Sequence, residues 1–173
     1  MLAEYNISVG MLKVKSLEIQ SENLDEISES SVIEAFGKVR LPMIVEDAGL
    51  FIDTLNGFPG PYAAYVYKTI GNEGLLKLMI GISERKAKFR SSIAYLESGL
   101  AMPHCFDGEV QGEITLEART SRDGGGFGFD PVFMPAGIRK TFSEMSLDEK
   151  NRFSHRASAL RQFGEWYRKQ SRR

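Results

Sequence analysis

The hydrophobic period of this chain changes along its length, and these changes limit the folds that it can adopt. Residues 62–82 predict a helix interrupted near Gly71, whereas residues 89–116 alternate in the manner of an antiparallel meander. A second helix is predicted near the C-terminus, where one face collects Phe153, Ala157, Leu160, Phe163 and Tyr167. Interleaved helices and strands predict an α/β or α+β sandwich with a mixed sheet.

Length and composition indicate one domain covering residues 1–173. The chain has 173 residues, 42% of them hydrophobic, which is enough for a core, and it contains no repeat, low-complexity tract or Pro/Ser-rich linker. Its 22 basic and 23 acidic residues nearly cancel, which argues against nonspecific binding to nucleic acid or to a membrane. A phosphate ligand would therefore need a local site.

The cysteine and histidine content narrows the possible chemistry. The single cysteine, Cys105, cannot form an internal disulfide, and the N-terminus has no apolar run of signal-peptide or membrane-spanning length. We therefore expect a reducing, cytoplasmic location, with Cys105 as an inert thiol. His104 and His155 lack metal-ligand spacing, so a zinc site is not expected.

Two carboxylates interrupt an apolar segment in the first third of the chain. Residues 41–45 predict a short buried strand, and Glu46 and Asp47 follow it directly, ahead of Ala48 and Gly49. This order predicts negative charge at the C-terminal edge of a sheet, where α/β folds bind ligands. Hard oxygen ligands suit Mg²⁺, and a carboxylate beside a metal ion can deprotonate water. The alternative is a solvated strand-to-turn junction.

A glycine-rich segment, residues 123–131, is the second candidate. Its four glycines let the backbone approach a ligand closely, and the rings of Phe127 and Phe129 could pack on a planar base. It is not a Walker loop, because no Gly-Lys-Ser/Thr sequence follows. The alternative is a mobile hinge between strands.

A basic stretch, residues 140–156, is the third candidate. Ser146 and Glu149 have capping-box spacing, and Ser154 could cap a second helix, which would place His155 and Arg156 in its first turn. A basic first turn is electrostatically unfavourable without an anion, so the pattern favours an anionic ligand. The alternative is a solvated charged face.

Four motifs in order and spacing resemble the inosine/xanthosine triphosphate pyrophosphatase family: residues 46–50, 57–60, 127–131 and 150–156. The resemblance extends from about Leu17 to the C-terminus. It implies an elongated α/β/α sandwich with a mixed central sheet, a deep active-site cleft, a homodimer and a requirement for Mg²⁺. The implied reaction is hydrolysis of non-standard purine nucleoside triphosphates (ITP, dITP, XTP) to nucleoside monophosphate and pyrophosphate.

The resemblance also implies roles for individual residues. Asp47 would bind the metal ion and act as general base, with Glu46 beside it as a supporting metal ligand and Glu18 as the other metal ligand. Lys150 would contact phosphate, and the base pocket would be lined by Phe127, Gly128, Phe129, Asp130, His155 and Arg156. A donor such as Arg156 would pair with a 6-oxo purine and oppose the amino group of adenine.

Two departures from the family pattern bear on substrate binding. At Ala48 the family commonly has Ser or Thr, whose hydroxyl could bind phosphate. Family members also begin with a strand and a Thr/Ser-x-Asn-x-x-Lys loop, and no such segment precedes residues 1–10. We therefore expect an N-terminally truncated chain that starts at an internal methionine. The alternatives are a nucleotide- or partner-binding module with little turnover, and a pyrophosphatase for modified pyrimidine or standard nucleotides.

Overall fold

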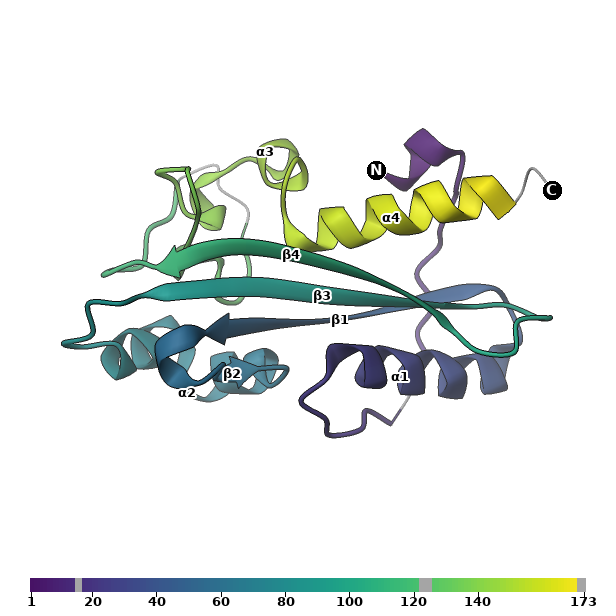
Figure 1. Cartoon of the computed structure of the whole chain (residues 1–173), viewed down its shortest axis with the longest axis horizontal. Coiled ribbons are helices and arrows are strands. Elements are labelled where there is room, and N and C mark those ends of the chain that lie inside the picture. The colour runs from purple at the N-terminus through teal and green to yellow at the C-terminus, as the bar shows by residue number, and fades with distance from the viewer. Residues whose placement is uncertain (15–16, 122–125, 171–173) are drawn as a thin grey trace. The chain divides into compact units, whose positions relative to one another are not determined.

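A computed structural model describes residues 1–14, 17–121 and 126–170 and confirms the α/β class (Figure 1). Its α-helices and strands alternate along the chain: α1 (Leu24–Val39), β1 (Met43–Ile52), β2 (Pro59–Gly60), α2 (Ala63–Leu78), β3 (Lys86–Leu96), β4 (His104–Ile114), β5 (Phe133–Pro135), α3 (Leu147–Asn151) and α4 (His155–Gln170). Four 3₁₀ helices complete the pattern: η1 (Leu2–Tyr5), η2 (Asp53–Leu55), η3 (Asp130–Val132) and η4 (Phe142–Glu144). Within the described residues, no helix is both long and apolar enough to cross a membrane.

The five strands form one sheet in the order β2-β1-β3-β4-β5. Leu50 of β1 pairs with Gly60 of β2, and Gly112 of β4 pairs with Pro135 of β5, both in antiparallel register. The sheet is antiparallel in its described part, where we expected mixed pairing. Residues 53–58 between β1 and β2 and residues 97–103 between β3 and β4 are too few for the long crossover that parallel neighbours need.

β1 is longer than the predicted strand and continues through both carboxylates. Glu46 and Asp47 therefore lie inside a strand and not at its C-terminal edge, which corrects our expectation. The strand continues because Leu50 and Ile52 are fully buried. Gly49 also admits β2, since a Cβ there would lie 2.5 Å from the carbonyl oxygen of Gly60.

The chain packs into two compact units, each assembled from segments that are remote in sequence. Unit 1 comprises residues 1–47, 91–108 and 155–173, and unit 2 comprises residues 48–90 and 109–154. Neither unit is one continuous stretch, and β1, β3 and β4 each contribute residues to both. A single domain covering residues 1–173 stays a prediction.

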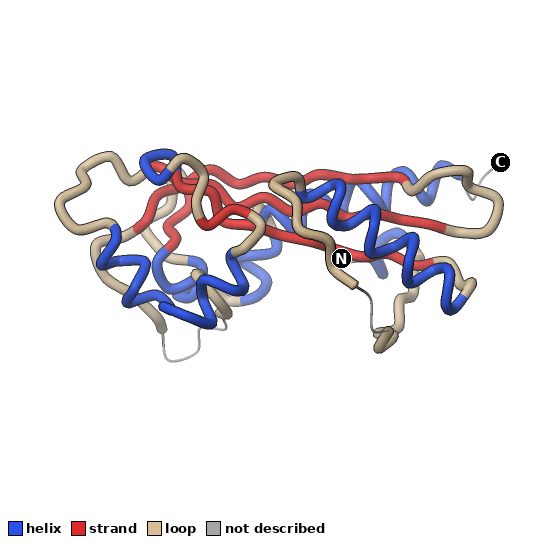
Figure 2. The backbone as a smooth tube through the Cα atoms, turned by 90° about the horizontal axis from the view of Figure 1, so that it is seen from below, coloured by secondary structure: helices blue, strands red, loops and turns tan. Residues whose placement is uncertain are grey.

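In unit 1, helices cover both faces of the strands, and the alternation along β3 shows this directly. Ile93 and Tyr95 belong to a core cluster with Phe163 of α4, while Ala94 belongs to another cluster with Val32 of α1. Figure 2 shows α1 in front of the red strands of this unit and α4 behind them. The period of two along β3 thus directs neighbouring residues to different helices.

In unit 2, aromatic rings from distant segments make the centre of the core. Phe89 of β3 lies 4.7 Å from Phe133 of β5, and Phe142 of η4 lies 5.2 Å from Phe133, measured between ring centroids. Helix α2 adds Leu75, which is fully buried. The expected interruption of this helix is present at Gly71, whose φ of 62° is non-helical.

Candidate functional site

Glu46 joins two segments of unit 1 through one carboxylate oxygen. Its Oε1 accepts hydrogen bonds from Oγ of Ser91, at 2.8 Å, and from Nε of Arg156, at 2.6 Å. The Glu46 side chain is 26% exposed and that of Arg156 is 36% exposed, so the pair is partly shielded from water. Arg156 lies in the first turn of α4, as expected. The carboxylate of Glu46 therefore supplies at least part of the negative charge that the basic first turn of α4 requires.

Asp47 and Glu46 are neighbours in a strand, and strand geometry directs neighbouring side chains to opposite faces. Oδ2 of Asp47 is buried. Glu18 is exposed in a segment without helix or strand. Among the described residues, no three Asp, Glu, His or Cys side chains gather into a group that could hold a metal ion.

The start of α4 packs tightly against β4. His155 is the first residue of the helix and is 5% exposed, and Ser154 before it is 3% exposed. A Cβ on Gly108 of β4 would lie 1.9 Å from the carbonyl oxygen of His155, so only glycine fits there. Gly108 lies inside β4. This glycine fixes the position of the His155 backbone.

In unit 2, Lys150 and Asp130 form a buried ion pair. Nζ of Lys150 lies 2.5 Å from Oδ2 of Asp130. Asp130 is 2% exposed and Lys150 is 9% exposed. The same carboxylate oxygen accepts a hydrogen bond from the backbone N–H of Phe127, at 2.9 Å. Asp130 therefore binds both Lys150, the candidate for phosphate binding, and the backbone of Phe127 in the glycine-rich segment.

Two rings lie beside the ammonium group of Lys150. Nζ is 5.0 Å from the ring centroid of Phe127 and 4.9 Å from that of Phe142, within the range of cation–π attraction. Phe127 is 64% exposed. Phe129, by contrast, is 3% exposed and contacts Tyr67 edge to face at 5.5 Å. Of the two rings expected to pack on a base, only that of Phe127 is open to a ligand.

Two predicted site residues remain: Gly128 in the glycine-rich segment and Ala48 in β1. Gly128 has a φ of 62°, and its carbonyl accepts a hydrogen bond from Nδ2 of Asn72, at 3.2 Å. Ala48 is half-buried in β1. Residues 123–125 of the glycine segment lie outside the described residues.

Three side chains that contact the candidate residues are not among the predicted site residues. Ser91 donates to Glu46, Phe142 lies beside Lys150, and Asn72 holds the Gly128 carbonyl. Phe142 lies within the basic stretch, residues 140–156, which is the one signal that could have marked it. Nothing in the local sequence distinguishes Ser91 or Asn72, because their partners are 45 and 56 residues away.

The chain is similar to proteins of one family along nearly its whole length. A model of the Ham1 family matches residues 1–166. A dITP/XTP pyrophosphatase of Methanopyrus kandleri is 47% identical over 167 residues, which cover 96% of this chain and 87% of that relative. The dITP/XTP pyrophosphatase of Thermococcus kodakarensis is 49% identical over 160 residues, which cover 92% and 84%. The structure of the Staphylococcus aureus Ham1 protein matches with a TM-score of 0.82 and 27% identity, covering 91% of this chain and 82% of that chain. The chain belongs to the Ham1 family, which confirms the resemblance inferred from its four motifs.

Proposed function

We propose that this protein is a nucleoside triphosphate pyrophosphohydrolase that converts non-standard purine nucleoside triphosphates, dITP, ITP and XTP, to monophosphate and pyrophosphate. The observation that carries the proposal is the 47% identity to a dITP/XTP pyrophosphatase across 96% of the chain. The carboxylate of Asp47 in β1 and the buried ammonium group of Lys150 in α3 supply groups that such a reaction needs. A module that binds nucleotide without turnover is not favoured by this similarity.

Asp47 is the proposed general base. A water molecule attacks the α-phosphorus, the bond between that phosphorus and the oxygen bridging to the β-phosphorus breaks, and pyrophosphate leaves. The proton lost by the attacking water passes to the carboxylate of Asp47. Burial of one Asp47 oxygen supports this role, because a buried carboxylate has a defined orientation.

The family depends on a metal ion, and we propose Mg²⁺ for this chain. The donor chemistry fits, since Mg²⁺ binds one or two carboxylates together with substrate phosphates and keeps several waters. Asp47 would be its first protein ligand, with Glu18 as the second candidate. Glu46 is not proposed as a ligand of the ion, because its Oε1 already accepts hydrogen bonds from Ser91 and Arg156. We propose that it holds Arg156 in position. When bound, the ion would neutralise phosphate charge.

Phosphate and base recognition are assigned to other groups. Lys150 would bind a phosphate oxygen, with its ammonium group oriented by Asp130. The exposed ring of Phe127 would stack on the purine. Arg156 carries N–H donors besides the Nε–H that bonds to Glu46, and one of them would donate to the 6-oxo group. The amino group of adenine is itself a donor, so it would leave this Arg156 N–H without an acceptor, which disfavours ATP.

A homodimer and a cytoplasmic location remain part of this proposal. Aromatic side chains exposed around α2 support an interface, because such residues are enriched in interface cores: Phe58, 41% exposed, Tyr62, 43%, Tyr65, 69%, and Tyr67, 42%. Light scattering after size-exclusion chromatography would report the mass, and Tyr65→Lys should shift it towards that of a monomer.

Pyrophosphate release with Mg²⁺ tests the function. We expect turnover of ITP, dITP and XTP, with much less on ATP, GTP or dUTP. Asp47→Asn should lower kcat by about 10²–10⁴-fold, the usual contribution of a general base. Asp53→Asn is the matched control, because Asp53 is an exposed aspartate just beyond the same strand. Equal turnover by Asp47→Asn and Asp53→Asn would refute the assignment, and ITP binding without pyrophosphate release would favour the binding module.

A further inference from the structure

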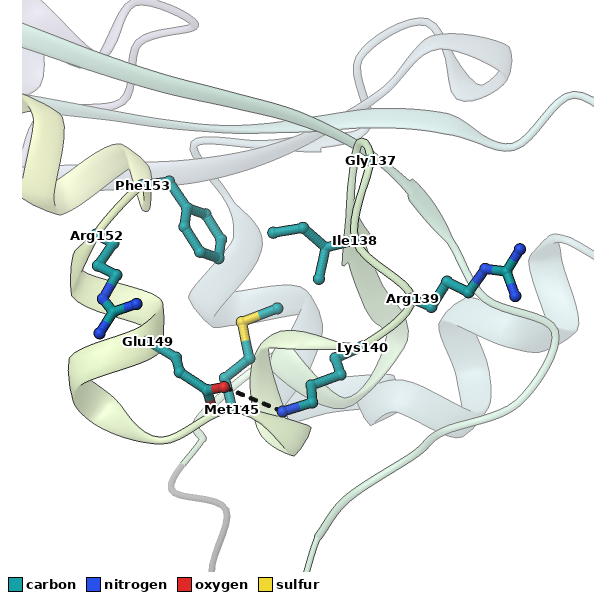
Figure 3. Close-up of a pocket in the computed structure, with 8 residues that line it drawn as sticks. All are labelled: Gly137, Ile138, Arg139, Lys140, Met145, Glu149, Arg152 and Phe153. Carbon is teal, nitrogen blue, oxygen red and sulfur yellow. Dashed lines mark hydrogen bonds and ion pairs between the residues drawn. The ribbon is translucent and has the colours of Figure 1, made fainter.

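Unit 2 contains a pocket of about 450 Å³ that none of the predicted site residues line. It lies between the loop that carries Ile138 and the segment formed by α3 and Phe153 (Figure 3). Its volume falls within the usual range of small-ligand sites, which is about 300–1,000 Å³. The proposed reaction gives this pocket no role.

Three apolar side chains face the interior of the pocket. Figure 3 shows Ile138, Met145 and Phe153 converging from different segments. Ile138 and Phe153 are only partly buried, although both pack against the core of unit 2. Phe153 also stacks on Phe142, with ring centroids 6.2 Å apart and planes at 26°. A planar apolar group could therefore displace water from a preformed surface.

Charged side chains surround this apolar surface, and cations outnumber carboxylates. Lys140 and Arg152 are cationic, and Glu149 is the one acidic residue of the lining. Both Glu149 oxygens have partners within the protein, since Oε2 accepts from the backbone N–H of Ser146 at 2.9 Å and Oε1 accepts from Nζ of Lys140 at 3.1 Å. Arg139 belongs to the same lining, but its side chain points away from the apolar residues in Figure 3.

We propose that this pocket binds a small organic anion that carries a planar apolar group. The apolar group would lie on Phe153 and Ile138, and the negative group would lie beside Lys140 and Arg152. Concave shape, apolar interior and surplus positive charge together select this class over neutral or cationic molecules. None of the proposed nucleotide-binding residues lines the pocket, although Phe153 stacks on Phe142, which lies beside Lys150.

Naphthalene-1-sulfonate is a suitable probe because it has one ring system and one permanent negative charge. In a ¹H–¹⁵N NMR titration of the full chain, we expect shifts centred on residues 137–140 and 145–153. A molecule of this size should bind with a Kd on the order of 1 mM. Saturating ITP should leave the probe in place.

Charge variants make the test specific. Lys140→Gln should weaken binding of the sulfonate about fivefold, since it removes a cation and leaves Glu149 without that partner. Glu149→Gln should tighten binding by a similar factor, and it retains capping-box chemistry at Ser146, because Gln also serves at that position. Arg139→Gln is the matched control and should change affinity less than twofold.

Tighter binding by Glu149→Gln cannot arise from loss of folding. The neutral probe naphthalene-1-methanol should bind all three variants equally. This result would show that the affinity changes of the sulfonate come from charge and not from a changed pocket shape. Equal affinity of the sulfonate for all three variants would overturn the proposal. So would displacement of the probe by ITP, or shifts centred outside these residues.

Discussion

Nζ of Lys150 lies 2.5 Å from Oδ2 of Asp130, and the two residues are 9% and 2% exposed. They are 20 residues apart in the chain. Removing one partner from such a pair leaves a buried charge without compensation. We therefore expect Asp130 to act as a positioning residue for Lys150.

Asp130→Asn should lower the free energy of unfolding by about 3 kcal/mol at pH 7, because Lys150 would keep its charge without a carboxylate partner. The double variant Asp130→Asn with Lys150→Met should recover much of that loss, since the buried charge is gone. Urea unfolding measures both. A double variant no more stable than Asp130→Asn would show that the ion pair does not determine stability here.

The pair between Arg156 and Glu46 should matter more for activity than for stability. It is partly exposed, so Arg156→Gln should cost no more than about 1 kcal/mol in unfolding free energy. We expect kcat/KM for ITP to fall about tenfold or more, with a smaller preference for ITP over ATP. Arg168→Gln, an exposed residue near the end of the same helix, should leave kcat/KM unchanged. Equal effects of the two substitutions would argue against a role for Arg156 in recognition.

Glu144 should contribute to the loss of stability in acid. The backbone N–H of Thr141 lowers the pKa of this carboxyl below its ordinary value of 4.5, and the Thr141 hydroxyl and Arg119 act in the same direction. A lowered folded-state pKa gives stability that is present above the unfolded pKa and is lost as pH falls through the folded pKa. In Glu144→Gln, unfolding free energy should therefore fall less steeply below about pH 4.5. An unchanged slope would contradict this.

Arg85 should not tolerate replacement by lysine. Its guanidinium group donates to four backbone carbonyls, those of Met79, Ile82, Ile114 and Thr115, at 2.6–3.3 Å. An ammonium group cannot reach four acceptors in one plane, so Arg85→Lys should cost about 2–3 kcal/mol in thermal or urea unfolding. Arg90→Lys serves as control, because among the described residues Arg90 of β3 donates to no backbone carbonyl in the way that Arg85 does: it has a distant ion pair with Glu109, at 3.8 Å, and lies over the ring of Phe51, at 5.5 Å. Its effect should stay below about 1 kcal/mol.

Cys105 should resist alkylation. Burial, and after it the carboxylate of Glu29, whose Oε1 lies 3.4 Å from Sγ, raise the pKa of its thiol to about 12. A raised pKa means less thiolate, about one part in 10⁴ at pH 8. Iodoacetamide should therefore react at least about 100-fold more slowly with the folded protein than with the same protein in urea. Comparable rates in both states would show that the thiol is accessible and acidic.

Local features were determined by the sequence itself. Leu24, Ile27, Ser31 and Ala35 recur every three or four residues, and all four are buried in α1. The capping box of Ser146 and Glu149 and the interruption of α2 at Gly71 also follow from nearby residues. Helix periodicity, caps and glycine conformation depend on residues within one or two turns, so they can be read from short windows. The family likewise follows from the sequence, because it is carried by the order and spacing of four motifs.

Long-range relationships were decided only by the tertiary structure. The extension of β1 through Glu46 and Asp47 depends on β2 and on the core beneath Leu50. Arg156 and Glu46 are 110 residues apart, and no local pattern relates them. Phe129 and Phe127 look equivalent in the sequence, yet one is 3% exposed and the other 64%. Burial and ion pairing depend on which distant segments meet, and only packing of the whole chain decides that.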